Sequence, residues 1–256
     1  MRNAQNEIPN KIYKFCHLSA GNDKDLDEKK LYSLREEKIW MSDCSVLNDP
    51  FEGLFSFVSS EIFNEQNEQI KNIIQTHLNE QERYLQASFS YNYDNILMWG
   101  HYANGCRGYC VEFTVNRKDF LFPVQYIDKR PLLSSLTYGK SDTEDLTIFQ
   151  TNLYKCNLQD RFRYIHYIQS MKSKIWEYEN EVRLISIDSF KPNSNKCGNA
   201  DSGVYGLKAS KIIIGYQCHY KEELINIAKM LNIPVSIMEI PLDSKEYKLV
   251  EKELQS

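Results

Sequence analysis

The alternation of apolar and polar residues along the chain predicts a set of short strands, followed by a helix between two strands. Residues 11–16, 38–42, 86–90 and 108–113 alternate in polarity or form short apolar runs rich in aromatic and β-branched side chains. Such runs are typical of strands. Near the end of the chain, residues 204–242 contain two strand-like apolar runs around an amphipathic helical stretch. This arrangement predicts a β-α-β unit.

Helices and connections follow from the same kind of pattern. Apolar residues at helical spacing predict helices over residues 61–85, 96–104 and 147–173. We expect residues 122–127 to form the hairpin partner of residues 108–113. The stretch 191–203, which contains Pro, Asn, Ser and Gly, is expected to be a loop. The charged stretch 22–30 is expected to be a loop that leads into a short helix through residues 31–34.

These elements together predict one α+β domain. Residues 1–10 are expected to form a loose leader, and residues 11–256 a single domain with a mixed, mainly antiparallel sheet flanked by helices. A chain of 256 residues is long enough to bury a core without disulfides or metals. No internal repeat, low-complexity tract or linker composition divides the sequence.

Charge and composition narrow the classes of partner and compartment. The formal net charge of −4 provides no long-range attraction for nucleic acid or an acidic membrane surface. No apolar run approaches the ~18 residues of a membrane helix, and the N-terminus lacks the apolar core of a signal peptide. Seven irregularly spaced cysteines without an export signal indicate reduced thiols. The sequence therefore predicts a cytoplasmic protein without a membrane partner.

The most informative segment is the acidic stretch 174–187, which is expected to form a strand. Because strand side chains alternate faces, four charged residues would share one face about 6.6 Å apart: Glu177, Glu179, Glu181 and Arg183. Three carboxylates this close repel one another unless a positive group lies among them. A solvated edge strand would tolerate them. Alternatively, Arg183 holds one carboxylate in place, and the cluster faces a ligand hydroxyl, a proton or a developing cation.

A second polar island is the turn around Pro50. The simpler interpretation is a turn that Pro50 fixes and that Asn48 and Asp49 close by bonding their own backbone. The alternative is a rigid turn that presents Asp49 or Glu52 to a pocket.

A third island combines a predicted strand with a predicted helix. Ser88 and Ser90 share one strand face, toward either solvent or the ribose or amide of a ligand. Trp99 and Tyr102 are three residues apart on the helix and can share a face. They form either core or a stacking wall for a planar ring. His101 is either a structural residue or a general base.

Metal chemistry has weaker support in the sequence. The five histidines show no ligand spacing, so no metal site is predicted. A metal-dependent hydrolase that uses Asp49, Glu52 and the later glutamates remains an alternative. No Gly-x-Gly-x-x-Gly or Walker motif indicates a nucleotide cradle of those types.

The order of these motifs resembles the bacterial family of domain of unknown function 2971, over residues 11–215. No function comes with this family. The resemblance rests on the following elements: Tyr13-Lys14-Phe15, Asn48-Asp49-Pro50-Phe51-Glu52, Ser88-Phe89-Ser90 with Met98-Trp99-Gly100-His101-Tyr102-Ala103, Gly108-Tyr109-Cys110-Val111-Glu112-Phe113, Val124-Gln125-Tyr126, Trp176-x-x-Glu179-x-Glu181-x-Arg183 and Ile213-Ile214-Gly215.

More distantly, the layout is similar to that of ADP-ribosyltransferases, which build an NAD pocket from three strands. In this resemblance, Tyr13 or His17 would contact the ribose from the first strand. Ser88 or Ser90 would be the residue of the second strand. The third strand of that superfamily supplies a glutamate, often in a Glu-x-Glu pair, and Glu179-x-Glu181 matches it.

This resemblance implies an enzyme with NAD as its substrate and no metal. Breaking the nicotinamide–ribose bond develops an oxocarbenium-like cation, which Glu181 would stabilise. Glu179 would orient an acceptor or activate water, and Trp99 and Tyr102 would hold the nicotinamide. The expected partners are a small-molecule nucleotide and, for a transferase, an unidentified macromolecular acceptor.

The sequence also departs from the ADP-ribosyltransferase pattern. No Arg ends the first predicted strand, and no Ser-Thr-Ser triplet follows the second. The alternative function is therefore a module that binds a nucleotide or a protein without catalysis, in a bacterial stress or phage-defence system.

Overall fold

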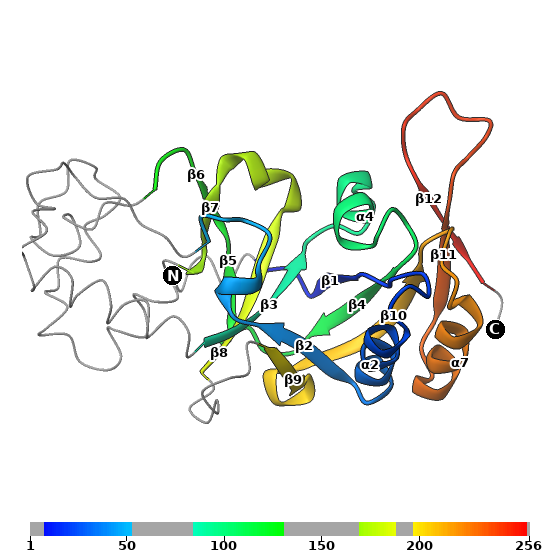
Figure 1. Cartoon of the computed structure of the whole chain (residues 1–256), viewed down its shortest axis with the longest axis horizontal. Helices are drawn as coiled ribbons and strands as arrows, with labels where there is room; N and C mark the ends of the chain where they lie inside the picture. The colour runs from blue at the N-terminus through cyan, green and yellow to red at the C-terminus, as the bar shows by residue number, and fades with distance from the viewer. Residues whose placement is uncertain (1–7, 53–83, 131–168, 188–196, 255–256) are drawn as a thin grey trace, which may run out of the picture.

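The computed structural model describes residues 8–52, 84–130, 169–187 and 197–254, whose strands build a curled sheet (Figure 1). The strands are β1 (Lys11–Cys16), β2 (Lys38–Ser42), β3 (Tyr84–Ser90), β4 (Tyr109–Val115), β5 (Leu121–Pro123), β6 (Gln125–Ile127), β7 (Met171–Ser173), β8 (Glu181–Ile187), β9 (Cys197–Asp201), β10 (Leu207–Ile214), β11 (Val235–Glu239) and β12 (Val250–Glu253). Within the described ranges, ten of them form one sheet in the order β12-β11-β10-β4-β1-β3-β2-β9, with β8 beside β3 and β5 beside β8. Strands β6 and β7 form a separate parallel pair.

The helices lie on both faces of the sheet, α4 on one face of β1 and β4 and α2 and α7 on the other (Figure 1). The described helices are α2 (Lys24–Arg35), α4 (Ile96–Tyr102) and α7 (Lys221–Leu231), with 3₁₀ turns η1 (Cys44–Val46), η3 (Lys174–Glu179) and η4 (Gly203–Tyr205). Side chains cap the N-termini of α2 and α4, where Asp23 accepts a hydrogen bond from the Leu26 amide and Asn95 accepts one from the Leu97 amide. None of these described helices is long and apolar enough to cross a membrane.

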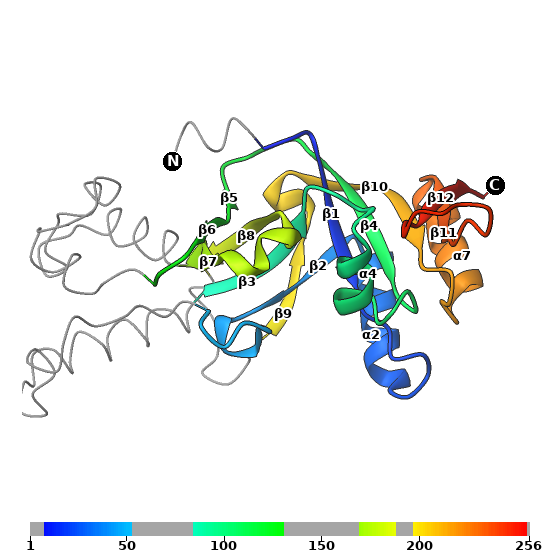
Figure 2. The same cartoon turned by 90° about the horizontal axis from the view of Figure 1, so that it is seen from above.

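The predicted α+β class is confirmed, with a mixed, mainly antiparallel sheet. Strands β1 and β4 pair antiparallel along their length, from Lys11 opposite Thr114 to Cys16 opposite Tyr109. The predicted C-terminal β-α-β unit is also confirmed, because β10 and β11 are parallel and α7 connects them. This unit and the β6–β7 pair lie at opposite ends of the sheet (Figure 2).

The sheet divides at β3, and this division positions the site. One edge of β3 pairs with β8 from Tyr84 to Ser90. The other edge meets β1 only at Ser90, opposite Tyr13, and β2 only at Gln86. Strands β1 and β2 therefore separate along β3 and leave its middle uncovered on that edge.

In the described parts of the chain, two apolar clusters pack against the sheet. The larger one joins the strands to α2 and α7 through Leu31, Leu34, Leu224 and Ile227. The smaller one surrounds Trp99 of α4, which is fully buried. Burial of these side chains is the main favourable contribution to folding, at about 25 cal/mol per Å² of apolar surface.

The predicted hairpin of residues 122–127 with residues 108–113 is wrong. Strand β5 pairs with β8 instead, and β6 pairs with β7. Pro123 has no backbone N–H and ends the first pairing. The amide of Val124 then donates to the carbonyl of Glu181, and the amide of Gln125 donates to the carbonyl of Ser170.

Two predicted loops are partly regular structure. The stretch 22–30 contains the first turns of α2, where buried Asp27 accepts hydrogen bonds from the amide and hydroxyl of Ser19. Of the expected loop 191–203, residues 197–201 form β9, which pairs with the edge of β2. The polar composition of both segments reflects their exposed faces, and pairing with a neighbour decides their structure.

Several predictions fall largely outside the described residues: most of the leader 1–10, most of the helix 61–85 and most of the helix 147–173. At their described ends, residues 84–85 belong to β3 and residues 171–173 to β7. Ile8 is buried in the larger apolar cluster.

We predict that Gly108→Ala strongly destabilises the fold. A Cβ at this position would lie 2.0 Å from the backbone oxygen of Cys16, which cannot rotate away. The free energy of unfolding should fall by at least about 2 kcal/mol, measured by urea denaturation. Gly100→Ala in α4 is the control. Its Cβ meets nothing within 4 Å, so the helix should gain about 0.5–1 kcal/mol. Equal effects of the two changes would contradict the close approach of Gly108 to β1.

Candidate functional site

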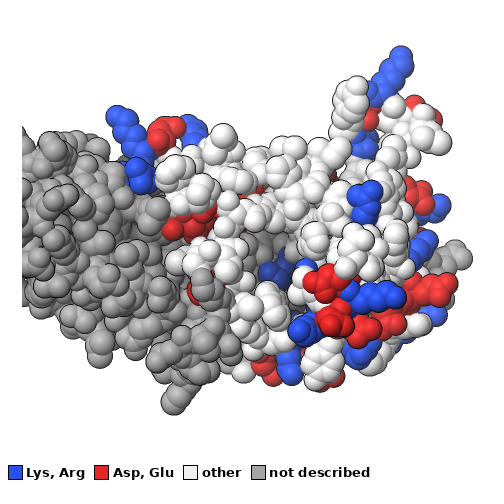
Figure 3. Space-filling model, in the orientation of Figure 1, with Lys and Arg blue, Asp and Glu red and all other residues white. Residues whose placement is uncertain are grey.

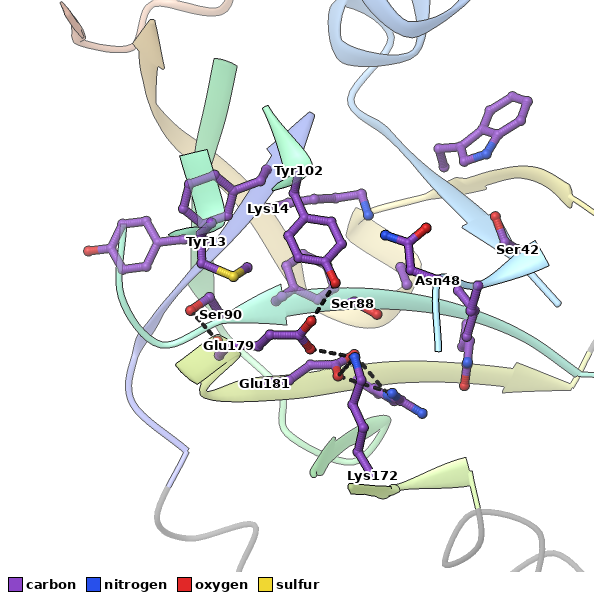
Figure 4. Close-up of a pocket in the computed structure, with 18 of the residues that line it drawn as sticks. Tyr13, Lys14, Ser42, Asn48, Ser88, Ser90, Tyr102, Lys172, Glu179 and Glu181 are labelled. Atoms are coloured by element: carbon purple, nitrogen blue, oxygen red, sulfur yellow. Dashed lines mark hydrogen bonds and ion pairs between the residues drawn. The ribbon is translucent and has the colours of Figure 1, made fainter. Parts of the chain in front are cut away.

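A pocket of about 230 Å³ lies where β1 and β2 separate over β3. Its walls come from β1, β2, the turn before residue 53, β3, α4 and the segment from β7 to β8. Figure 3 shows this face of the molecule hollowed near its centre, with Lys or Arg atoms visible in the hollow. The side chains that line the pocket are largely polar on the β8 side (Figure 4).

A buried ion cluster centred on Arg183 forms the base of this site. The Arg183 Nε and Nη2 donate to the two oxygens of Glu181 at 2.8 and 3.0 Å. Its Nη1 and Nη2 donate to the two oxygens of Glu52, and Nη1 also donates to the carbonyl of Gln169. All five N–H donors of the guanidinium are therefore bonded. Such bidentate pairing is what allows a fully buried charge to be stable.

The Glu181 carboxylate is held in its ionised form. Burial by itself would raise its pKa, but the charges of Arg183 and Lys172 and hydrogen bonds from Arg183 and Ser88 outweigh this effect. They lower the pKa of Glu181 from 4.5 to about 2. The Lys172 ammonium lies 3.4 Å from the Glu181 Oε2.

The neighbouring Glu179 has the opposite tendency. Its side chain is buried, accepts a hydrogen bond from the Tyr102 hydroxyl and pairs with the Lys172 ammonium (Figure 4). Burial raises the pKa of Glu179, the Glu181 charge raises it further, and Lys172 and Tyr102 only partly oppose this change. The Lys172 ammonium also lies 4.9 Å from the ring centroid of Trp176.

The backbone that brings both glutamates to Lys172 differs from the predicted continuous strand over residues 174–187. Residues 174–179 form η3, and β8 begins only at Glu181. Asn180 joins them in the left-handed conformation (φ 46°, ψ 58°), which Asn tolerates better than most residues. Its carbonyl accepts the amide of Tyr91, and the carbonyl of Glu179 accepts the hydroxyl of Ser90 at 2.7 Å. The interpretation as a solvated edge strand is wrong, because β8 is paired on both sides and Arg183 is buried.

The structure brings most of the predicted site residues together in the pocket lining: Tyr13, Asn48, Glu52, Ser88, Ser90, Tyr102, Glu179, Glu181 and Arg183. The remaining four do not line it: His17, Asp49, Trp99 and His101. These four residues are placed by contacts outside the pocket.

Trp99 belongs to the core and not to a wall of the pocket, which corrects the predicted nicotinamide contact. Its ring is fully buried, meets Phe15 edge-on with centroids 5.3 Å apart, and donates its indole N–H to the carbonyl of Tyr93. Asp49 follows the simpler interpretation of the turn, since its Oδ1 accepts the Phe51 amide at 2.9 Å. His17 and His101 are exposed, and the His101 ring lies beside the ring of Tyr178.

Sequence reasoning missed four polar residues of the pocket lining: Lys14, Ser42, Gln86 and Lys172. Lys14 stands within the first motif of the family resemblance, which was a usable signal. Gln86 occupies an unremarkable strand position. Lys172 falls in a stretch with a helical pattern, and nothing in the sequence indicates that it turns toward the glutamates.

The arrangement separates the roles of two adjacent carboxyl groups. Neighbouring carboxyl groups with pKa values moved in opposite directions are a common basis for dividing ionic stabilisation from proton transfer. Glu181 can stabilise a developing positive charge, and Glu179 can exchange a proton. Within the described residues, no group of three or more His, Cys, Asp or Glu side chains is arranged to hold a metal ion.

We predict that Arg183→Lys lowers the free energy of unfolding by about 3–5 kcal/mol, because an ammonium cannot bond both carboxylates and leaves buried charge unpaired. Arg35→Lys is the matched control: this Arg pairs with Glu223 at the surface, so its replacement should cost below about 1 kcal/mol. Urea denaturation of the two variants and the parent protein measures both effects. If Arg183→Lys lowered the free energy of unfolding by no more than Arg35→Lys does, Arg183 would not be the centre of the buried ion cluster.

We predict that acid lowers the free energy of unfolding in part because Glu181 becomes protonated. Its pKa is lowered in the folded state, so its contribution is present above the ordinary pKa of 4.5 and is lost as the pH falls toward about 2. Glu181→Gln should be less stable near neutral pH and should show a shallower loss across this window. Urea denaturation at a series of pH values tests this, with the exposed Glu253→Gln as control. An unchanged slope in Glu181→Gln would show that the carboxylate is not held ionised.

The predicted family resemblance is confirmed for part of the chain. Residues 98–184 match the family model described as protein of unknown function (DUF2971). No curated protein and no solved structure matches the chain. The matched stretch is thus similar to a DUF2971 domain, and it contains Tyr102, Lys172, Glu179, Glu181 and Arg183 of the pocket.

Proposed function

We propose that this protein cleaves the bond between nicotinamide and ribose in NAD, either transferring ADP-ribose to an acceptor or hydrolysing the dinucleotide. The observation that carries the proposal is the pair Glu179 and Glu181. Two carboxyl groups of one pocket, two residues apart, have pKa values moved in opposite directions. Cleavage of an N-glycosidic bond uses both properties.

The chemistry assigns each glutamate one task. As the bond between the ribose C1′ and the pyridinium nitrogen breaks, its electron pair leaves with nicotinamide, which becomes neutral and needs no proton. Positive charge develops on the ribose ring, and the ionised Glu181 stabilises it. A water or an acceptor hydroxyl then bonds to C1′, and its proton passes to Glu179, whose raised pKa suits a general base.

The strand arrangement gives further support. Tyr13 on β1, Ser88 on β3 and Glu181 at the start of β8 line one pocket, together with Glu179 at the end of η3. These are the positions that would contact NAD if the sequence resemblance to ADP-ribosyltransferases extends to the site. A cavity of about 230 Å³ is smaller than the ~300–1,000 Å³ of pockets that enclose a drug-sized ligand. It would therefore enclose the nicotinamide riboside end of NAD and leave the adenosine end outside.

A second candidate function is nucleotide binding without turnover. It is favoured by the hydrogen bonds that already occupy the carboxylate of Glu181. Both oxygens of Glu181 already accept hydrogen bonds from Arg183, and Lys172 lies beside one of them. A carboxylate held this firmly has less capacity to bond a ribose hydroxyl. In this case the glutamates would shape the pocket and would not take part in chemistry.

We predict that the purified protein releases nicotinamide from NAD, and that Glu181→Gln and Glu179→Gln each slow release at least about 100-fold. Ser88→Ala, which removes a pocket hydroxyl without breaking an ion pair of Arg183, should also slow release. Nicotinamide is followed by chromatography, and circular dichroism confirms that each variant is folded. Glu223→Gln, at the surface pair with Arg35, should release nicotinamide at the parental rate.

The same assay separates the two candidate functions. A protein whose melting temperature rises with NAD but which releases no nicotinamide would be a binding module. Full activity in folded Glu181→Gln would remove Glu181 from the chemistry. Absence of both release and stabilisation would overturn both functions.

A further inference from the structure

Lys14 on β1 is a charged pocket residue that has no charged partner in the part of the chain that the structure describes. Its side chain lines the cavity, and its ammonium end points past Tyr102 toward Asn48 (Figure 4). Within the described ranges, no carboxylate forms an ion pair with it and no acceptor takes a hydrogen bond from its Nζ. The contact recorded for the ammonium is the ring of Phe89, 5.4 Å from Nζ to centroid. Removal from water lowers the pKa of Lys14, and the through-space effects of Cys16 and Glu181 oppose this only partly.

The two other cations of the pocket behave differently. Arg183 and Lys172 are both buried against glutamates, which satisfy them. Lys14 is thus the pocket cation whose charge remains available in the described structure. An unpaired charge taken from water is costly, and keeping one in a cavity is understandable when a ligand supplies the opposite charge.

An independent observation also indicates a missing polar ligand. Gln86 lines the same pocket and is only 2% exposed, yet neither its amide nitrogen nor its amide oxygen has a hydrogen-bond partner among the described residues. Buried side-chain amides in native proteins are nearly always bonded. Among the described residues, this pocket therefore contains a cation without a carboxylate partner and a buried amide without a hydrogen-bond partner.

The polar groups are distributed unevenly around the cavity. Lys14 and Asn48 lie on one side of Tyr102, whereas Glu179, Glu181 and Lys172 lie on the other (Figure 4). An anion placed beside Glu179 and Glu181 would be repelled. An anion placed beside Lys14 and the amide of Asn48 would gain a direct charge pair. A ligand that spans the cavity would thus carry its anionic group at Lys14 and its sugar at the glutamates.

We propose that Lys14, assisted by Asn48, binds a phosphate group of the substrate, so that the pocket accepts a 5′-phosphorylated nucleoside in preference to the unphosphorylated nucleoside. A lysine ammonium is a compact point charge that suits a phosphate. This proposal rests on the proposed function, because it places the sugar of the same ligand at the Glu179–Glu181 pair. It adds a requirement on the substrate that the acidic pair alone does not impose.

The experiment compares two ligands that differ only in the phosphate. Calorimetric titration with nicotinamide mononucleotide and with nicotinamide riboside should show at least about tenfold tighter binding of the mononucleotide. Lys14→Met should remove this preference and leave the affinity for the riboside unchanged. It should also raise the melting temperature by a few degrees, because a partly buried charge without a carboxylate partner is removed. The matched control is Lys11→Met on the same strand, whose exposed ammonium pairs with Glu112; its preference should remain parental.

The outcomes separate this proposal from the proposed function. Equal affinity for the two ligands, no measurable binding of the mononucleotide, or a preference that survives in Lys14→Met would each overturn the phosphate site. Inorganic phosphate that competes with the mononucleotide in the parent protein but not in Lys14→Met would support it. A phosphate preference without nicotinamide release would keep the phosphate site and reject cleavage. Equal nicotinamide release from both ligands would keep cleavage and reject the phosphate site.

Discussion

The pairing of one buried guanidinium with two carboxylates is the interaction on which the site depends. Arg183 connects β8 to the turn that carries Glu52 and to the chain just before β7, through Glu52 and the carbonyl of Gln169. A buried charge is tolerated only when its geometry of hydrogen bonding is complete. The five donors therefore restrict how these segments can lie relative to one another. They also lower the pKa of Glu181, whereas burial raises the pKa of Glu179, two residues earlier.

The second constraint is the separation of β1 from β2 along β3. An antiparallel sheet normally has no room for a cavity between paired strands, because neighbours lie about 4.8 Å apart. Here β3 keeps its complete pairing with β8, while the other edge is shared between two strands that each touch one end. The sheet thus remains stable and still opens over Ser88. Among the described residues, Lys14 has no carboxylate partner and the buried amide of Gln86 has no hydrogen-bond partner, and both side chains lie in this opening.

Much of the candidate site could be predicted because its polar residues interrupt apolar patterns. Glu179, Glu181 and Arg183 drew attention through their charge density, and Ser88 and Tyr102 through their place in polar islands. Trp99 was misassigned because an aromatic residue has the same signature in a core as in a ligand wall. Lys172 could not be found, because its partners are seven and nine residues away across η3 and Asn180. The left-handed backbone conformation of Asn180 has almost no effect on the pattern of polar and apolar residues, so the sequence does not indicate it.

The sequence by itself determined the class of the fold, the strands β1 and β2 and the C-terminal β10-α7-β11 unit, because local polarity repeats with the period of the structure. It also determined that acidic, hydroxyl and aromatic residues would gather near one pocket. Only the tertiary structure decided that β5 pairs with β8, that Asn180 turns between the two glutamates and that Arg183 is buried. Those outcomes depend on contacts between segments that are distant in the sequence and on the burial of charged groups. Neither produces a pattern in the residues nearby in the sequence.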